Sequence, residues 1–222
     1  MQRKLKAILS SAAPFNGSAY DDLQRQAIRS WREVADSTIL FNNPEDIGEA
    51  SMCIEPRENP PCVHQMLTAA YKLFKEEDVI ALVNSDIVLT PETSRILQVA
   101  ERQHLGRGWA CTSFRWEDGQ VRGQGLDFFA MTMPVVVQVL RDCPRFMTVG
   151  RTLWDNWLNG WLRCHLPSQR FFNITDWKCV HHPLHDRIPN RLSNYTEEQV
   201  KEIFASGDLD CRGIPDTKYA IP

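Results

Sequence analysis

The sequence predicts an α/β protein of three layers, with helices on both faces of a mixed, mainly parallel sheet. Segments typical of strands and helices alternate through about the first hundred residues, as in β-α-β units. One expected strand, residues 79–83, is apolar at every position, which is typical of a strand buried on both faces. Polar residues follow it at once, at the place where open α/β sheets bind ligands.

Three strands are expected to carry the first half of the fold. They cover residues 4–10, 37–41 and 79–83. The helix between the first two begins at a capping box formed by Ser18 and Asp21, and Trp31 lies on its apolar face. Residues 48–62 are rich in Pro, Glu and Cys and are expected to be loop, with room for one short strand. A second helix is expected at about residues 64–77.

The second half is expected to be mixed. A helix begins after Thr90, because Thr is a good N-cap, Pro91 suits the first helical position and Glu92 favours the positive end of the helix dipole. Residues 109–116 alternate enough to form an exposed or edge strand. Further strands are expected at residues 127–131, 171–174 and 177–180, and further helices at residues 134–143, 152–165 and 196–205.

The composition excludes several classes of protein. With 222 residues, 43% hydrophobic and 24% charged, the chain is expected to be one globular domain with an extension. A net charge of -3 gives no general attraction to nucleic acid or anionic membrane. No apolar run approaches the roughly 20 residues of a transmembrane segment. The seven cysteines are scattered without a CxxC pair, which favours reduced thiols and a cytoplasmic location.

Asn84, Ser85 and Asp86 directly follow the buried strand. Polar groups in such a place cost free energy unless they have partners. Asp86 suits a hard divalent cation, while Asn84 and Ser85 offer hydrogen-bonding groups to a sugar or a ribose. The alternative is an aspartate that only caps a turn or the following helix.

A cluster of histidines lies late in the chain, at His181, His182 and His185. Imidazole groups are common ligands of transition metals, although loop histidines without any ligand are equally compatible with the sequence. A separate zinc site would combine Cys179 with Cys164 or His165, but this spacing matches no standard zinc module.

Asp155 lies in the first turn of an expected helix that carries Trp154, Trp157 and Trp161. A partly desolvated carboxylate can act as a general base toward an attacking hydroxyl group. The same carboxylate could instead close a capping box with Thr152. The spacing of the tryptophans favours a helix face packed in the core over a platform for a sugar.

The motifs in this order resemble the GT-A fold of family 2-like glycosyltransferases, which use nucleotide-diphospho-sugars. The resemblance covers roughly residues 4–187, and Asn84-Ser85-Asp86 is its variant DxD motif. It continues through GQGLDFFAM, a Trp-Asp helix and a late histidine. It implies a GT-A-like domain at residues 1–190, divided at about residue 105 into a nucleotide-binding half and an acceptor half. Residues 191–222 are then a helical extension packed on that domain.

The resemblance implies a metal-dependent transferase that moves a sugar, from a UDP-sugar by preference, to an acceptor hydroxyl. Asp86 would bind Mn²⁺ or Mg²⁺ together with His182, or with His185 as the second choice. Asp155 would be the base of an inverting transfer. The residues expected to contact the nucleotide-sugar are Ser10, Asn42, Asp46, Asn84, Ser85 and Arg151. Of the arginines that could pair with the diphosphate, Arg107, Arg115, Arg122 and Arg151, we retain only Arg151.

Asn84 departs from the family pattern, because it replaces the first acid of the DxD motif. Asn can still hydrogen-bond to a ribose or to a metal-bound water, but one charge is lost. A nucleotidyltransferase of the same fold is an alternative, although residues 10–17 lack the basic side chains of such enzymes. A non-catalytic module that binds sugar-nucleotides is another. The acceptor stays open among a glycan, a protein and a modified nucleic acid.

Overall fold

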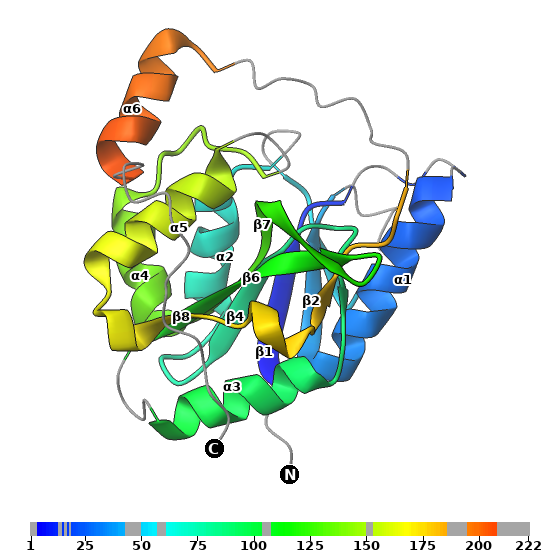
Figure 1. Cartoon of the computed structure of the whole chain (residues 1–222). Helices are drawn as coiled ribbons and strands as arrows, with labels where there is room; N and C mark the ends of the chain where they lie inside the picture. The colour runs from blue at the N-terminus through cyan, green and yellow to red at the C-terminus, as the bar shows by residue number, and fades with distance from the viewer. Residues whose placement is uncertain are drawn as a thin grey trace.

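The structure is a computed structural model of the chain (Figure 1). It describes residues 4–12, 15, 17, 19–42, 50–56, 61–103, 108–149, 153–185 and 195–207. The strands are β1 (Leu5–Ser10), β2 (Ala35–Phe41), β3 (Met52–Ile54), β4 (Val79–Val83), β5 (Val88–Leu89), β6 (Ala110–Glu117), β7 (Gln120–Thr132), β8 (Phe171–Asn173) and β9 (Val180–His181). The helices are α1 (Ala19–Val34), α2 (Val63–Leu73), α3 (Glu92–Gln103), α4 (Met133–Asp142), α5 (Trp154–His165) and α6 (Glu197–Gly207), with 3₁₀ turns η2 (Ser168–Arg170) and η3 (Thr175–Trp177).

These strands form one mixed sheet in the order β3-β2-β1-β4-β7-β6-β9-β5, and β8 pairs with β6. The strands from β3 to β4 are mutually parallel, so their carboxyl ends lie at one edge. β7 pairs antiparallel with both β4 and β6. The predicted mixed, mainly parallel sheet between helices is confirmed.

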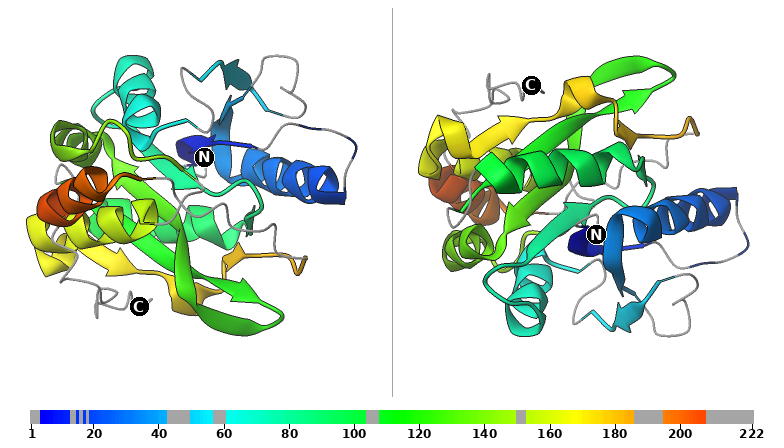
Figure 2. Two further views of the ribbon diagram at one scale, coloured as in Figure 1. Left: turned by 90° about the horizontal axis from the view of Figure 1, so that it is seen from above. Right: turned by 90° about the horizontal axis from the view of Figure 1, so that it is seen from below.

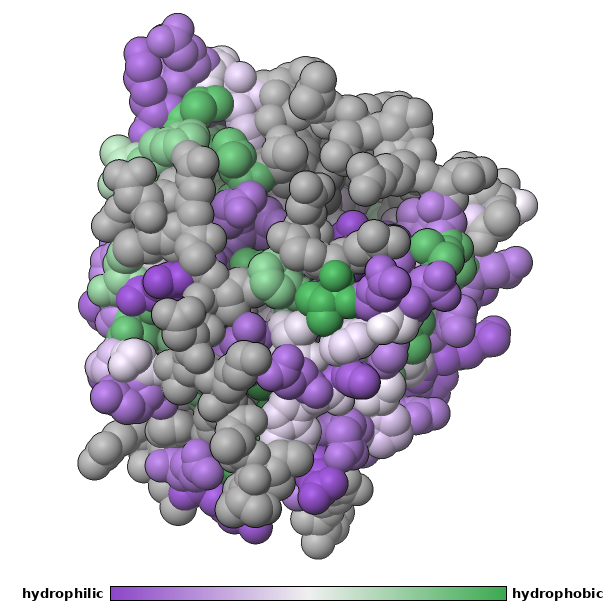
Figure 3. Space-filling model, viewed as in Figure 1, coloured by the Kyte–Doolittle hydropathy of each residue, from purple (hydrophilic) through white to green (hydrophobic). Residues whose placement is uncertain are grey.

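Helices cover both faces of this sheet. One buried cluster joins α2, α4, α5 and α6 to one face, and a second joins α1 and α3 to the other. Figure 2 shows α1 and α5 on opposite sides of the sheet. Val79–Val83 is buried along its whole length, as expected of a strand covered on both faces. On the face shown in Figure 3, hydrophobic residues form small separate groups among hydrophilic ones.

The hairpin of β6 and β7 differs from the sequence-based expectation. β6 pairs with β7, β8 and β9, and its first four residues are buried, so the prediction of an exposed or edge strand is wrong. The turn consists of Asp118 and Gly119, with φ of 50° and 71°. Two positive φ values are typical of a type I′ hairpin turn, for which Asp-Gly is a favoured sequence. The turn aligns Glu117 with Gln120 and sets the register of the hairpin.

Other expected elements need smaller corrections. The strand expected at residues 177–180 is instead η3 followed by the short strand β9. The short strand β5, just after the Asn84-Ser85-Asp86 segment, was not expected. Trp154, Trp157 and Trp161 are at most 2% exposed, so the expectation that they pack in the core is confirmed.

The C-terminal segment contributes one described helix to the fold. α6 packs on α5, and its Ile203 is fully buried. Before this helix, the Tyr195 hydroxyl accepts a hydrogen bond from the Thr148 backbone amide at 3.0 Å. Among the helices described, none has the length and apolar character needed to cross a membrane. Among the described residues, no two cysteines form a disulfide.

Candidate functional site

The candidate site lies at the carboxyl edge of the parallel strands. Ser10 ends β1, Asn42 follows β2 and Asn84 follows β4. β1 lies between the other two strands, so their ends are neighbours. Ligands bind at this edge in open α/β sheets, because the loops there leave a crevice beyond the strands.

The side chains at the ends of β1 and β2 are buried. The Ser10 hydroxyl donates a 2.6 Å hydrogen bond to the Val83 carbonyl and so fastens β1 to β4. Asn42 is 4% exposed, and its backbone amide donates to the Ile54 carbonyl at 3.2 Å. The other two predicted contacts of the nucleotide-sugar, Asp46 and Arg151, lie outside the described residues.

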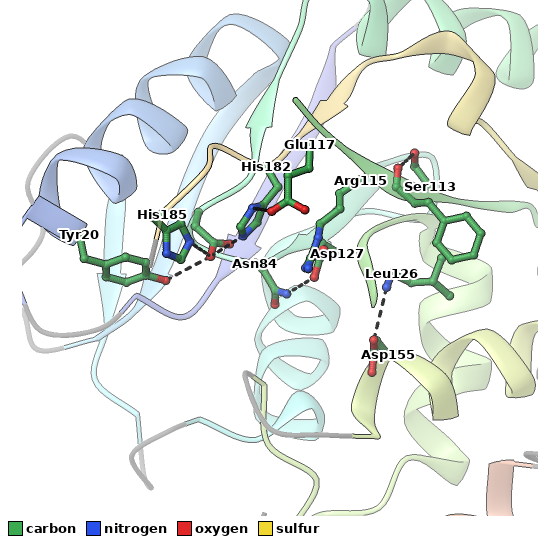
Figure 4. Close-up of polar contacts among 12 residues, drawn as sticks. Tyr20, Asn84, Ser113, Arg115, Glu117, Leu126, Asp127, Asp155, His182 and His185 are labelled. Atoms are coloured by element: carbon green, nitrogen blue, oxygen red, sulfur yellow. Dashed lines mark hydrogen bonds and ion pairs between the residues drawn. The ribbon is translucent and has the colours of Figure 1, made fainter. Parts of the chain in front are cut away.

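Asp86, His182 and His185 converge at this edge. Figure 4 labels the two histidines. The Asp86 Oδ2 atom lies 3.3 Å from His182 Nε2 and 3.4 Å from His185 Nε2. Strand pairing produces this meeting, because β5, just after Asp86, pairs with β9, just before His182. The His182 amide also donates to the Trp116 carbonyl of β6 at 2.8 Å. The two candidate histidines therefore share one carboxylate.

Helix α1 holds the segment that carries Asp86. The Trp31 indole Nε1 donates a 2.7 Å hydrogen bond to the Ile87 carbonyl. The Leu89 amide donates to the Ser30 hydroxyl at 3.0 Å. At the start of the same helix, the Tyr20 hydroxyl donates to Asp86 Oδ2 at 3.4 Å. Burial, together with the charge of Asp86, raises the pKa of Tyr20 to about 12, so this phenol stays a donor at neutral pH.

The charges of Asp86 and His182 support one another. Burial alone would raise the pKa of Asp86, but the hydrogen bond and charge of His182 outweigh it and lower this pKa. Burial alone would lower the pKa of His182, but Asp86 outweighs it and raises that pKa. On the other side of the ring, His182 Nδ1 lies 3.4 Å from Glu117 Oε1.

The three converging side chains fit a divalent metal ion. Their ligand atoms all lie within 4.8 Å of one another, and the side chains are 10–16% exposed. The charge of Glu117 near Nδ1 favours a proton on that nitrogen of His182 and leaves Nε2 as the ligand, and a carboxylate behind a ligating histidine is common around metal sites. Two imidazoles and one carboxylate suit Mn²⁺ better than Mg²⁺, which prefers oxygen ligands.

The zinc site considered around Cys179 does not form in the described part of the chain. The Cys179 thiol is fully buried in the apolar cluster under α1 and α3, whereas Cys164 is exposed on α5. Burial raises the pKa of Cys179 to about 12 and keeps the thiol protonated, although a thiolate is the form that binds metal.

Asn84 contacts a buried carboxylate on the neighbouring strand. Its side-chain amide donates to Asp127 Oδ1, and Arg115 Nη1 donates to Asp127 Oδ2 at 2.9 Å. Burial raises the pKa of Asp127, although Arg115 opposes this shift. Arg115, one of the arginines considered for the diphosphate, is therefore paired within the protein.

Asp155 lies in the first turn of α5 and contacts β7, the strand that carries Asp127. The Leu126 backbone amide donates to its Oδ2 atom at 3.4 Å. Burial, and to a smaller extent the charge of Asp127, raise the pKa of Asp155. Leu153, with φ of 87°, caps this helix, and Thr152, the partner considered for a capping box, lies outside the described residues.

Sequence reasoning missed Tyr20 and Glu117, and it did not foresee the role of Arg115. Arg115 lies beside Asp127 because β6 pairs with β7 in the hairpin, and Glu117 lies beside His182 because β6 also pairs with β9. The Asp118-Gly119 dipeptide is the signal that could have revealed this hairpin. Tyr20 had no comparable signal in the sequence.

Comparison with known proteins finds no matching family model and no matching curated protein. Solved structures do match. S. aureus TarS 1-349 in complex with UDP-GlcNAc has a TM-score of 0.55 and 10% sequence identity, over 92% of this chain and 66% of that one. A longer S. aureus TarS structure has a TM-score of 0.51 and 10% identity, over 82% of this chain and 37% of that one.

A mycobacterial protein also matches, with a TM-score of 0.51 and 13% identity, over 96% of this chain and 76% of that one. The chain thus spans less than two thirds of either TarS structure's length. At these identities the likeness concerns the fold. The chain has the GT-A-like fold of these TarS structures.

Proposed function

We propose that the chain is a metal-dependent glycosyltransferase that moves a sugar from a nucleotide-diphospho-sugar to an acceptor hydroxyl. The observation that carries this proposal is the meeting of Asp86, His182 and His185 at the carboxyl edge of a GT-A-like sheet. UDP-GlcNAc in the similarly folded TarS structure supports a UDP-sugar as the donor. The acceptor stays open among a glycan, a protein and a modified nucleic acid, and a cytoplasmic location stays a prediction.

In this proposal Asp86, His182 and His185 hold Mn²⁺ in preference to Mg²⁺. The ion, when bound, would neutralise the charge that grows on the leaving diphosphate. Glu117 orients the His182 ring, and Tyr20 orients the Asp86 carboxylate. The contacts proposed for the nucleotide-sugar remain Ser10, Asn42, Asp46, Asn84, Ser85 and Arg151.

Asp155 is the proposed base. The acceptor oxygen attacks the anomeric carbon while the bond from that carbon to the diphosphate oxygen breaks, and the hydroxyl proton moves to Asp155. This single displacement inverts the configuration at that carbon. Burial supports the role, because it raises the pKa of the carboxyl group and so makes the carboxylate a stronger base.

The test is a screen of sugar-nucleotides for Mn²⁺-dependent hydrolysis, in which water replaces the unknown acceptor. We expect Asp86→Ala to lower the rate by about 100-fold or more, since it removes the shared carboxylate. Asp36→Ala is the matched control. Asp36 is exposed and pairs with Lys6 at the opposite edge of the sheet, so its loss should leave the rate unchanged. Full Mn²⁺-dependent hydrolysis by Asp86→Ala would contradict the proposal.

Two further measurements identify the alternatives. With added pyrophosphate, a nucleotidyltransferase would convert a nucleotide-diphospho-sugar into a nucleoside triphosphate and a sugar 1-phosphate. A non-catalytic module would bind UDP with Mn²⁺ in calorimetry and hydrolyse no donor.

A further inference from the structure

The side chain of Asn84, two residues before Asp86, binds a buried carboxylate on the neighbouring strand β7. β4 and β7 pair antiparallel up to Val83 and Phe128. Directly after this pair, the Asn84 backbone amide donates to the Asp127 carbonyl at 3.2 Å, and the side-chain amide donates to Asp127 Oδ1. Backbone and side chain together hold Asn84 against Asp127.

This contact fixes which way the Asn84 amide faces. An ionised carboxylate only accepts hydrogen bonds, so it must face the nitrogen of the amide. The reversed amide would set two acceptors against one another in a buried place, which is unfavourable. Figure 4 shows the Asn84 oxygen pointing away from Asp127. The group that Asn84 offers on that side is therefore an acceptor, as a carboxylate would be.

Asp127 is itself firmly held. It is 4% exposed. Arg115, on strand β6, donates a 2.9 Å hydrogen bond from Nη1 to the second carboxylate oxygen of Asp127. Its chain neighbour Leu126 donates the hydrogen bond that Asp155 accepts. The pair of Asn84 and Asp127 therefore stands between Asp86 and Asp155, the two ends of the proposed site.

We infer that Asp127 is a positioning residue of the donor site: it orients Asn84 so that the amide oxygen accepts a hydrogen bond from a hydroxyl group of the nucleotide-sugar. This inference rests on the proposed function. A carboxylate at position 84 would supply both a hydrogen-bond acceptor and a negative charge, and here two residues supply them. The amide provides the acceptor, and Asp127 keeps the negative charge behind it.

An exchange of the two residues tests this inference. In Asp127→Asn nothing fixes the amide of Asn84, and we expect the Kd for a UDP-sugar in the presence of Mn²⁺ to rise about tenfold, as for the loss of one well-placed hydrogen bond. In Asn84→Asp two carboxylates meet in a buried place, so thermal stability and UDP-sugar affinity should both fall. The double variant Asn84→Asp/Asp127→Asn restores one acid and one amide. Its affinity should return to within about threefold of the original value, and its Tm should return close to the original.

Calorimetry with Mn²⁺ and UDP, or with Mn²⁺ and a UDP-sugar, gives the readout together with Tm, and Asp36→Asn is the control. If Asp127→Asn binds both ligands more weakly, the hydroxyl group lies on the ribose. If it binds only the UDP-sugar more weakly, the hydroxyl group lies on the sugar. Either result supports the inference. If the double variant recovers Tm but not affinity, the pair is only structural and the inference is wrong, although the proposed function stands. If the unaltered protein binds neither ligand, the proposed function is wrong and the inference fails with it.

Discussion

Asp127 is buried and Asp86 and Asp155 are partly buried, and their neighbours give the three aspartates of the candidate site different acidities. Burial raises the pKa of each, but His182 reverses this shift for Asp86. Asp86 thus stays an anion, as a metal ligand must, while Asp155 has the raised pKa that suits a general base. Carboxyl groups whose pKa values differ in this way can perform different tasks at one pH.

Replacing the proposed base should remove a pH dependence as well as activity. We expect Asp155→Asn to lower the rate of donor hydrolysis by about 100- to 10,000-fold, with little change in the Kd for UDP. In the unaltered protein the rate should fall as the pH drops through the raised pKa of Asp155, because the protonated carboxyl group cannot accept a proton. A profile of rate against pH checks this. An unchanged acidic limb in the variant would exclude Asp155 as the base.

The same substitution should stabilise the folded protein at neutral pH. The folded pKa of Asp155 lies above its ordinary value of 3.8, so above that folded pKa the buried charge costs folding free energy. Asn carries no charge and avoids this cost. The advantage of the variant should shrink as the pH falls through the folded pKa and vanish below the unfolded one. Urea unfolding at several pH values measures it, and a variant less stable at neutral pH would contradict the prediction.

At the scale of elements, the segment between β4 and β5 depends on α1 for its position. Besides the contact of Tyr20 with Asp86, the Trp31 indole binds the Ile87 carbonyl, and the Tyr20 hydroxyl lies 3.4 Å from the Ser85 hydroxyl. At the start of the next strand, the Ser30 hydroxyl accepts from the Leu89 amide. Asp86 lies next to Ile87, whose carbonyl the indole binds. A substitution on α1 should therefore change the position of Asp86 relative to His182 and His185.

Trp31→Phe tests this dependence. We expect a loss of about 1 to 3 kcal/mol in the free energy of unfolding beyond the packing effect, because the buried Ile87 carbonyl loses its donor. Mn²⁺ affinity should also fall. Trp109→Phe is a matched control, since Trp109 is buried in the same cluster and its indole nitrogen has no hydrogen-bond partner in the described structure. Equal effects of both variants, by urea unfolding and calorimetry, would show that packing alone matters.

The strand β6 shows how element context overrides a local pattern. Its alternation predicted an exposed or edge strand, and its last four residues are indeed half-buried. The Asp118-Gly119 turn folds β7 back along one side, and β8 and β9 cover the other, so β6 lies inside the sheet. The number of strand neighbours depends on distant segments and cannot be read from periodicity.

At the scale of the whole molecule, the site joins segments that are distant in the chain. Asp86 follows β4, His182 follows β9, Asp127 lies in β7 and Asp155 begins α5. A ligand that spans these residues binds only when the fold is complete. Its binding free energy therefore adds to the stability of the entire chain.

Mn²⁺ and UDP together should raise Tm. At ligand concentrations about 100 times the Kd, the gain is about 2.7 kcal/mol, which corresponds to roughly 5 to 10 °C for a chain of this size. Asp86→Ala should remove this shift, whereas Asp36→Ala should keep it. Differential scanning fluorimetry provides the measurement. A shift that persists in Asp86→Ala would place the metal elsewhere.

The sequence by itself determined the parallel half of the fold and the edge where polar residues gather. Buried strands, apolar helix faces and helix caps are local patterns, so Val79–Val83 and the residues after it could be read directly. The pairing of Asp86 with a late histidine came from the resemblance, and the structure brings both His182 and His185 to that carboxylate.

Only the tertiary structure decided what surrounds these residues. Asn84 and Asp127 are 43 positions apart, and their contact depends on the register between β4 and β7. Arg115 meets Asp127 through the pairing of β6 with β7, and Glu117 meets His182 through the pairing of β6 with β9. A side chain's partner, and with it its charge and pKa, is set by contacts between distant segments. For that reason the sequence indicated the edge where polar residues gather, whereas the fold determined which of these groups bind one another.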